Sequence, residues 1–379
     1  MQGDSEREIE TSLRLLGKKK SDLAMVILKP LGLLLFLYLF LLSISLFGDA
    51  FKLFGKDFAN NLLKTTAHPI VGLFIGILAT SLIQSSSTTT TIVVTMVAGG
   101  ALSIEGAIPI VMGANIGTTI TNTIVSLTHI THSEQFKRAF SGAIVHDIFN
   151  LLSVAILLPL QIYTNFLGHS ALFFESLLEN AGGLSFGSPI KAITKPVTTV
   201  IIDLLSQNAW LTAIAAIAIL FIALRYMVKV LQSLVLSRVE GFFNRFVFKT
   251  TFHALMLGVI ITALVQSSSI TTSLMVPLVG AGVLSLRRVY PFTLGANVGT
   301  TITAILAALV TSQSAALAVA LAHLMFNICG IAIFLPLSKI PINISFWLAK
   351  SINKSRFIPI GFILLIFFLI PLALIYLLR

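Results

Sequence analysis

The sequence predicts an all-α, polytopic membrane protein with two inverted-topology repeats, and three observations indicate this fold. Of the 379 residues, 56% are hydrophobic and only 10% are charged, whereas soluble domains carry about 25% charged residues. Apolar runs at 23–47, 209–227 and 357–378 reach the roughly 20 residues that a helix needs to cross a bilayer. One polar motif also occurs twice within otherwise lipid-compatible sequence.

The repeated motif begins with Gln-Ser-Ser-Ser, at 84–87 and again at 266–269. Each copy continues with several threonines and, after an apolar stretch, with Gly-Ala-Asn-Ile/Val-Gly-Thr-Thr, at 113–119 and 295–301. Hydroxyl and amide groups are unfavourable in hydrocarbon unless they are paired or face a cavity. Two such clusters at matching places in two halves are typical of a transporter binding site.

The first repeat is predicted over 23–160, after a cytoplasmic segment at 1–22, and its first run, 23–47, crosses outward. Residues 68–103 would form a helix of about 54 Å, too long for a hydrocarbon core of about 30 Å. We therefore expect a re-entrant helical hairpin with Gln-Ser-Ser-Ser at its tip, near the midplane. Irregular backbone is tolerated at that depth only inside protein or against a cavity.

A helix at 107–127, broken at 113–119, is expected to cross inward, and a helix at 140–160 to cross outward. Three crossings are an odd number, so the second repeat, 207–338, is expected to be inverted, with its own hairpin and broken helix. The segments that remain are an external linker at 161–206 and, at 339–379, a C-terminal interfacial segment with the last span.

The net charge of +11 does not indicate nucleic-acid binding, because of where the basic residues stand. Lys18–Lys20 precede the first span, and Lys137 and Arg138 lie in a loop between spans. This is the positive-inside pattern, which places the N-terminus in the cytoplasm. The aromatic residues are mostly phenylalanines in apolar runs and are not interleaved with arginines.

The Gln-Ser-Ser-Ser runs supply hydroxyls, amides and, at a helix break, free backbone N–H groups. A helix N-terminus carries about half a positive charge and favours an anion. No Lys or Arg stands between Lys64 and Lys137, or between Lys249 and Arg287, so a co-bound cation is expected to compensate the anion, which couples the two ligands. The candidate anion-binding residues are Gln84, Ser85, Ser86, Ser87, Gln266, Ser267, Ser268 and Ser269.

The second half of each motif is expected to bind that cation. Its glycines allow unwound backbone, and unwound carbonyls with threonine hydroxyls and the asparagine amide are ligands that sodium uses in transporters. Asp147 joins them because an intramembrane carboxylate is a functional candidate by default. The candidate cation ligands are Thr88, Asn115, Thr118, Thr119, Asp147, Thr271, Asn297, Thr300 and Thr301.

Simpler interpretations stay open for several of these residues. Serine and threonine in membrane helices often bond back to the preceding turn or join helices. Gly113–Gly117 is alternatively a site of close helix packing, and His146 and His323 are alternatively satisfied interior histidines. A serine hydrolase is disfavoured, since neither Gln-Ser-Ser-Ser run stands in a Gly-x-Ser-x-Gly elbow and the motif is doubled, which one nucleophile does not need. A passive channel is a further alternative.

At these motifs the chain resembles the type II sodium–phosphate cotransporters, over roughly residues 69–336. The resemblance includes both Gln-Ser-Ser-Ser runs, the sequence around Gly-Ala-Asn-Ile-Gly-Thr, and His-Asp-Ile-Phe-Asn at 146–150. It extends to Ile-Thr-Lys-Pro at 193–196, where we expect the family to have an acid at the Lys195 position.

The resemblance implies a sodium-driven symporter, not an enzyme, that imports inorganic phosphate across a bacterial inner membrane by alternating access. Phosphate is then the anion of the Gln-Ser-Ser-Ser residues, and sodium is the co-substrate at the cation ligands, with no other cofactor. The expected partners are phosphate, sodium ions, the lipid bilayer and a second copy in a homodimer, but no nucleic acid. The alternative is a cation-coupled transporter of another oxyanion or a dicarboxylate on the same architecture.

Overall fold

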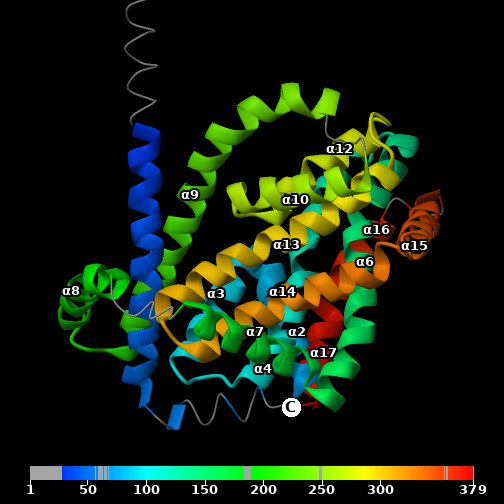
Figure 1. Cartoon of the computed structure of the whole chain (residues 1–379). Coiled ribbons are helices and arrows are strands. Elements are labelled where there is room, and N and C mark those ends of the chain that lie inside the picture. The colour runs from blue at the N-terminus through cyan, green and yellow to red at the C-terminus, as the bar shows by residue number, and fades with distance from the viewer. Residues whose placement is uncertain are drawn as a thin grey trace, which may run out of the picture.

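The computed structural model describes residues 28–55, 57–58, 63, 66, 68–182, 189–246, 250–353, 355 and 357–378. All the regular elements in these residues are helices (Figure 1), as the sequence predicts. The cytoplasmic segment expected at 1–22 lies outside the described residues.

The helices fall into two sets along the chain. The first set is an N-terminal helix Leu28–Gly55, α2 Pro69–Ile83, α3 Ser86–Ala98, α4 Ile104–Thr118, α5 Ile120–Ser126, η1 Leu127–His129 and α6 Ser133–Thr164. The helices α7 Phe166–Gly182 and α8 Pro189–Leu204 follow. The second set is α9 Ala209–Phe246, α10 Thr251–Val265, α11 Ser268–Ser273, α12 Met275–Gly280, α13 Leu286–Thr311, α14 Ser314–Phe334, α15 Lys339–Lys350, η2 Ser351–Asn353, α16 Ile358–Leu364, η3 Leu365–Leu369 and α17 Ile370–Leu378.

Within the described residues, seven helical segments are long and apolar enough to cross a membrane. They include the spans expected at 23–47, 107–127 and 140–160, which the structure has at Leu28–Gly55, Ile104–His129 and Ser133–Thr164. The multi-pass prediction is therefore confirmed.

The segment expected to form the first hairpin is divided into α2 and α3, and its counterpart into α10 and the segment Ser268–Gly280. All four are apolar but too short to be counted among the candidate spans. That each pair enters and leaves on one face of the membrane, and that the repeats are inverted, stay predictions.

Of the two helix breaks expected at 113–119 and 295–301, the first occurs only at the last residue of its interval, Thr119, and the second is absent. α4 runs unbroken through Gly113 and Gly117 to Thr118 and is interrupted only at Thr119, while α13 continues through Gly295 and Gly299 without interruption. The alternative interpretation, close helix packing, is the one that the structure supports.

The packing of these glycines gives the physical reason. A Cβ added at Gly113 would lie 1.9 Å from the carbonyl oxygen of Leu73, and one at Gly295 would lie 1.9 Å from that of Leu255. The backbone of α4 therefore lies directly on α2, and α13 lies in the same way on α10. Small residues in membrane helices permit this approach, so the glycines are needed inside a regular helix and not at a break.

The stretch expected to be a linker, 161–206, is largely helical in its described part. α6 continues to Thr164, and Leu167 and Ala171 of α7 are buried in one apolar cluster with Ala318 and Ala322 of α14. α8 lies beside the N-terminal helix, at the edge of the molecule in Figure 1. The position of the stretch 161–206 outside the membrane stays a prediction.

Candidate functional site

The two Gln-Ser-Ser-Ser motifs form the same backbone turn. Gln84 ends α2 in the left-handed conformation, with φ 56°, and Gln266 ends α10 with φ 59°. The residue that follows, Ser85 or Ser267, is extended, and its hydroxyl accepts a hydrogen bond from the backbone N–H three residues on, at 3.2 and 3.4 Å respectively. A left-handed residue thus closes one helix and a serine N-cap opens the next.

The two turns share one cavity of about 410 Å³, lined on the motif side by polar groups and on the other by α9. The predicted anion-binding residues that line it are Gln84, Ser85, Ser87, Gln266, Ser267 and Ser269, together with Thr88 from the cation set. The structure therefore brings six of the predicted anion ligands into one site. Ser86 and Ser268 are buried and are not among the described residues that line the cavity.

Hydrogen bonds between the repeats hold the turns together at this cavity. Ser87 Oγ donates to the carbonyl oxygen of Gln266 at 3.1 Å, and Ser269 Oγ donates to the carbonyl oxygen of Thr118 at 3.2 Å. Both serine hydroxyls therefore donate their protons to hydrogen bonds between the repeats, while their oxygens can still accept a hydrogen bond. Any ligand at the cavity competes with these two bonds for the serine protons.

Two basic side chains that the sequence argument missed lie at the same cavity. Arg225 and Lys229, one helical turn apart on α9, line it opposite the two turns. The observation that the hairpins hold no Lys or Arg therefore does not extend to the whole cavity, because α9 lies outside the hairpins. The signal in the sequence was the spacing of the two basic residues at the end of an apolar run.

The predicted cation ligand Asp147 is fully buried, at 0% exposure, on α6. Its carboxylate accepts a hydrogen bond from Thr119, and Thr123 Oγ1 donates to it at 3.4 Å. No cationic side chain forms an ion pair with it in the described part of the chain. A buried carboxylate without a basic partner requires a proton or a cation.

Two further predicted cation ligands, Asn115 and Asn297, form a different cluster. His146 Nε2 donates to Asn297 Oδ1 at 2.5 Å, and His323 Nε2 donates to Asn115 Oδ1 at 3.3 Å. Each repeat thus supplies the histidine for the asparagine of the other. Asn150 extends the cluster, since its amide donates to the Asn115 carbonyl oxygen at 2.8 Å and accepts from Asn297 at 2.8 Å. These bonds satisfy Nε2 of each histidine, but Nδ1 of both is buried without a hydrogen-bond partner among the described residues. The interpretation of the histidines as satisfied interior residues therefore holds for only one nitrogen of each ring.

The other candidate cation ligands bond mainly to their own helices. Their hydroxyls lie against backbone carbonyls three or four residues earlier or, for Thr88, against the hydroxyl of Ser85. This is the back-bonding that threonine makes in membrane helices. The residues concerned are Thr88, Thr118, Thr271, Thr300 and Thr301. The structure therefore does not gather the predicted cation ligands into one site.

Comparison with known proteins decides the family. The family model described as Na+/Pi-cotransporter matches residues 39–175 and 219–376. The chain belongs to the Na+/Pi-cotransporter family. The family consists of transporters and not of enzymes, and the match extends beyond both repeated motifs into the first and last candidate spans.

The relatives of this cotransporter chain are similar over most of its length. It is 35% identical to the sodium-dependent phosphate transport protein 2A of Rattus norvegicus, over 94% of this chain and 68% of the relative. It is 33% identical to the sodium-dependent phosphate transport protein 2B of Homo sapiens, over 90% of this chain and 64% of the relative. No solved structure matches the chain.

Proposed function

We propose that this chain is a sodium-coupled symporter that imports inorganic phosphate across the cytoplasmic membrane by alternating access. The observation that carries the proposal is the cavity of about 410 Å³ in which both Gln-Ser-Ser-Ser turns face Arg225 and Lys229. The relatives named as sodium-dependent phosphate transport proteins support the same substrate and the same ion.

The donors at the cavity suit a small, highly charged oxyanion. The serine hydroxyls and the amides of Gln84 and Gln266 provide directional hydrogen bonds, and the guanidinium of Arg225 and the ammonium of Lys229 provide positive charge. Hydrogen bonds to an ionised oxyanion are roughly twice as strong as those between neutral groups. The phosphate is thereby bound between the two repeats, which is where a relative motion of the repeats exchanges access.

Sodium coupling is supported at Asp147 and not at the cavity. With Arg225 and Lys229 present, the anion does not need sodium for its charge, so the argument from missing basic residues no longer applies. Asp147, with the hydroxyls of Thr119 and Thr123, provides hard oxygen ligands in a fully buried position. Sodium bound there neutralises the carboxylate and orders α5 against α6, close to Thr118, whose carbonyl oxygen accepts the Ser269 bond.

The membrane arrangement in this proposal is that of two inverted repeats with re-entrant hairpins, the N-terminus in the cytoplasm and the bacterial inner membrane as the location. The basic residues Lys18–Lys20 ahead of the first span support the cytoplasmic N-terminus. The matching turns at Gln84 and Gln266 support the repeat arrangement. The roles of Ser86 and Ser268 in binding, and the homodimer, belong to the proposal as predictions.

The test is uptake of radiolabelled phosphate into proteoliposomes, with an inward sodium gradient compared with an equal potassium gradient. Accumulation above equilibrium with sodium alone is the expected result. Uptake that only equilibrates would instead indicate a passive channel, and competition by unlabelled sulfate, arsenate or succinate identifies another preferred anion. Sodium-independent accumulation would refute the coupling.

A further inference from the structure

A second polar pocket, of about 210 Å³, lies outside the cavity of the two turns. It is formed by the N-terminal helix, α8, the ends of α3 and α13, and Gln313 at the start of α14. The residues used below are Ser45, Asp49, Lys52, Thr194, Lys195 and Thr198. None of these belongs to the repeated motifs.

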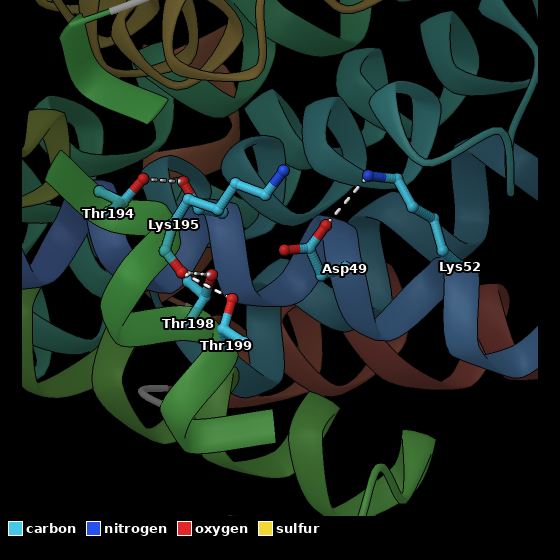
Figure 2. Close-up of polar contacts among 7 residues, drawn as sticks. Asp49, Lys52, Thr194, Lys195, Thr198 and Thr199 are labelled. Atoms are coloured by element: carbon cyan, nitrogen blue, oxygen red, sulfur yellow. Dashed lines mark hydrogen bonds and ion pairs between the residues drawn. The ribbon is translucent and has the colours of Figure 1, made fainter. Parts of the chain in front are cut away.

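The charges in this pocket leave it net positive. Lys52 Nζ donates to Asp49 Oδ1 at 2.9 Å, and Figure 2 shows the amine of Lys195 reaching from α8 towards the same carboxylate. Both lysines and the aspartate line the pocket, so two ammonium groups face one carboxylate. The three charged side chains among the lining residues thus leave one positive charge in excess, and an anion is the ligand that complements it.

The hydroxyls around the lysines are fixed by the fold. Ser45 Oγ lies 3.0 Å from Thr194 Oγ1 and joins the N-terminal helix to α8. Thr198 Oγ1 donates to the carbonyl oxygen of Lys195 at 3.0 Å, in the turn of α8 that carries this lysine. Thr194 and Thr198 are each only 1% exposed, so α8 is anchored beneath Lys195 while the lysine side chain itself is exposed. The base of the pocket is therefore preformed, and its ammonium groups are accessible.

The pocket is separated from the cavity along two helices. Ser86 begins α3 at the first turn and Ala98, which lines the pocket, ends it, a distance of about 18 Å along the helix axis. On α13, Thr303 bonds to Gln266 and Thr311 lines the pocket, about 12 Å further along the helix. The pocket is thus a different site from the cavity but is in contact with the same helices.

We propose that this pocket binds one phosphate-type oxyanion between Lys52 and Lys195. Lysine ammonium groups bind phosphate oxygens as point charges, and the net positive charge of the pocket favours an anion over a cation. The oxyanion is either free inorganic phosphate or the phosphodiester of a lipid headgroup, which offer the same chemistry. Binding here does not require the transport activity proposed above.

The experiment measures how fast a lysine-reactive reagent labels each lysine of the intact protein in nanodiscs, by mass spectrometry. In discs of digalactosyldiacylglycerol, a neutral lipid without a phosphate group, millimolar inorganic phosphate is expected to slow labelling of Lys52 and Lys195 severalfold. Lys339, exposed at the start of α15, is the matched control and is expected to label at an unchanged rate. Potassium chloride at equal ionic strength controls for screening.

The second arm replaces the neutral lipid with phosphatidylglycerol in the absence of free phosphate. Protection in this arm alone assigns the lipid headgroup, and protection by phosphate in neutral discs assigns the free anion. Each result supports the proposal, whereas unchanged labelling of both lysines in both arms overturns it. In Lys195→Gln, the protection of Lys52 is expected to disappear.

A variant of the cavity separates this proposal from the transport proposal. The double variant Ser87→Ala, Ser269→Ala alters the cavity and leaves the pocket intact. It is expected to retain the protection of Lys52 and Lys195, whatever its transport rate. Loss of protection in this variant would show that the protection of Lys52 and Lys195 depends on the cavity, and would contradict a separate site.

Discussion

Thr303 Oγ1 donates to Gln266 Oε1 at 2.6 Å, so the side chain of the second turn is held against α13. The equivalent pair in the first repeat, Thr121 and Gln84, lacks this bond. Thr121 Oγ1 is buried without a hydrogen-bond partner among the described residues, and Gln84 is exposed at the cavity. The two turns have the same backbone conformation, but only the second glutamine side chain has this hydrogen bond. Such a difference is expected for one of two alternating conformations.

This difference predicts unequal effects of two matched substitutions. Thr303→Val leaves Gln266 Oε1 without its donor and is expected to destabilise the protein by about 1–3 kcal/mol. Thr121→Val removes a hydroxyl that has no partner and is expected to leave stability within about 0.5 kcal/mol of wild type. Thermal unfolding in detergent compares the two, and an equal loss in both would contradict the asymmetry.

The serines that bridge the repeats are predicted to control phosphate affinity. Ser87→Ala and Ser269→Ala each remove a cavity hydroxyl and a bond between the repeats, and each is expected to raise the KM for phosphate about tenfold, equivalent to about 1.4 kcal/mol. Initial rates of uptake in proteoliposomes measure this. Ser176→Ala on α7, where the hydroxyl bonds only to its own helix, is the control. Wild-type KM in both cavity variants would remove these serines from the site.

The basic residues on α9 are predicted to attract the anion through charge. Arg225→Gln and Lys229→Gln are each expected to raise the KM severalfold, with a smaller dependence of uptake on ionic strength than wild type. Potassium chloride titration at constant sodium measures that dependence. Lys350→Gln, far along the chain on α15, is the control, and an identical salt response in all variants would exclude Arg225 and Lys229 from phosphate binding.

Asp147 is predicted to carry the sodium dependence. Asp147→Asn keeps the shape of the side chain and removes its charge, so phosphate binding is expected to persist while its enhancement by sodium is lost, a change of tenfold or more in apparent sodium affinity. Phosphate binding measured with increasing sodium or choline tests this. Glu134→Gln at the start of α6, an exposed acid paired with Lys137, should respond to sodium like wild type. Normal sodium enhancement in Asp147→Asn would place the ion elsewhere.

The glycines of the helix contacts are predicted to tolerate no side chain. Gly113→Ala and Gly295→Ala place a Cβ where a backbone carbonyl oxygen already lies, and overpacking of this kind typically costs about 1–3 kcal/mol or more. Both variants are expected to unfold at lower temperature in detergent or to fail to accumulate. Gly361→Ala, which has open space around its Cβ position, should be stable, and stable Gly113→Ala protein would refute the close contact.

The sequence was sufficient for the class of fold and for the position of the two turns. Repetition of Gln-Ser-Ser-Ser in two apolar contexts indicated matched sites, and Gln84 and Gln266 indeed adopt one conformation. Local patterns did not determine the state of the glycines, because glycine serves equally at a helix break and at a close contact. Only the position of the neighbouring helix, 1.9 Å from the missing Cβ of Gly113, distinguishes these roles.

The site itself was only partly predictable, for a related reason. The motif residues were identified, but Arg225 lies on a helix without the motif and is brought to the cavity by tertiary packing. Likewise, nothing in the local sequence of Asn297 indicated that its partner would be His146 of the other repeat. Contacts between distant segments determine these relationships, and a single sequence contains no direct record of them.

The glycine contacts also determine how the molecule can deform. Where backbone lies against backbone, as between α2 and α4 or α10 and α13, two helices cannot slide or rotate past one another without collision. Each pair therefore moves as one rigid body, and motion is confined to the contacts between the pairs. The bonds found there, such as those from Ser87 to Gln266 and from His146 to Asn297, are single hydrogen bonds that thermal motion breaks and re-forms. Rigid helix pairs joined by reversible contacts are what a transporter with two stable conformations requires.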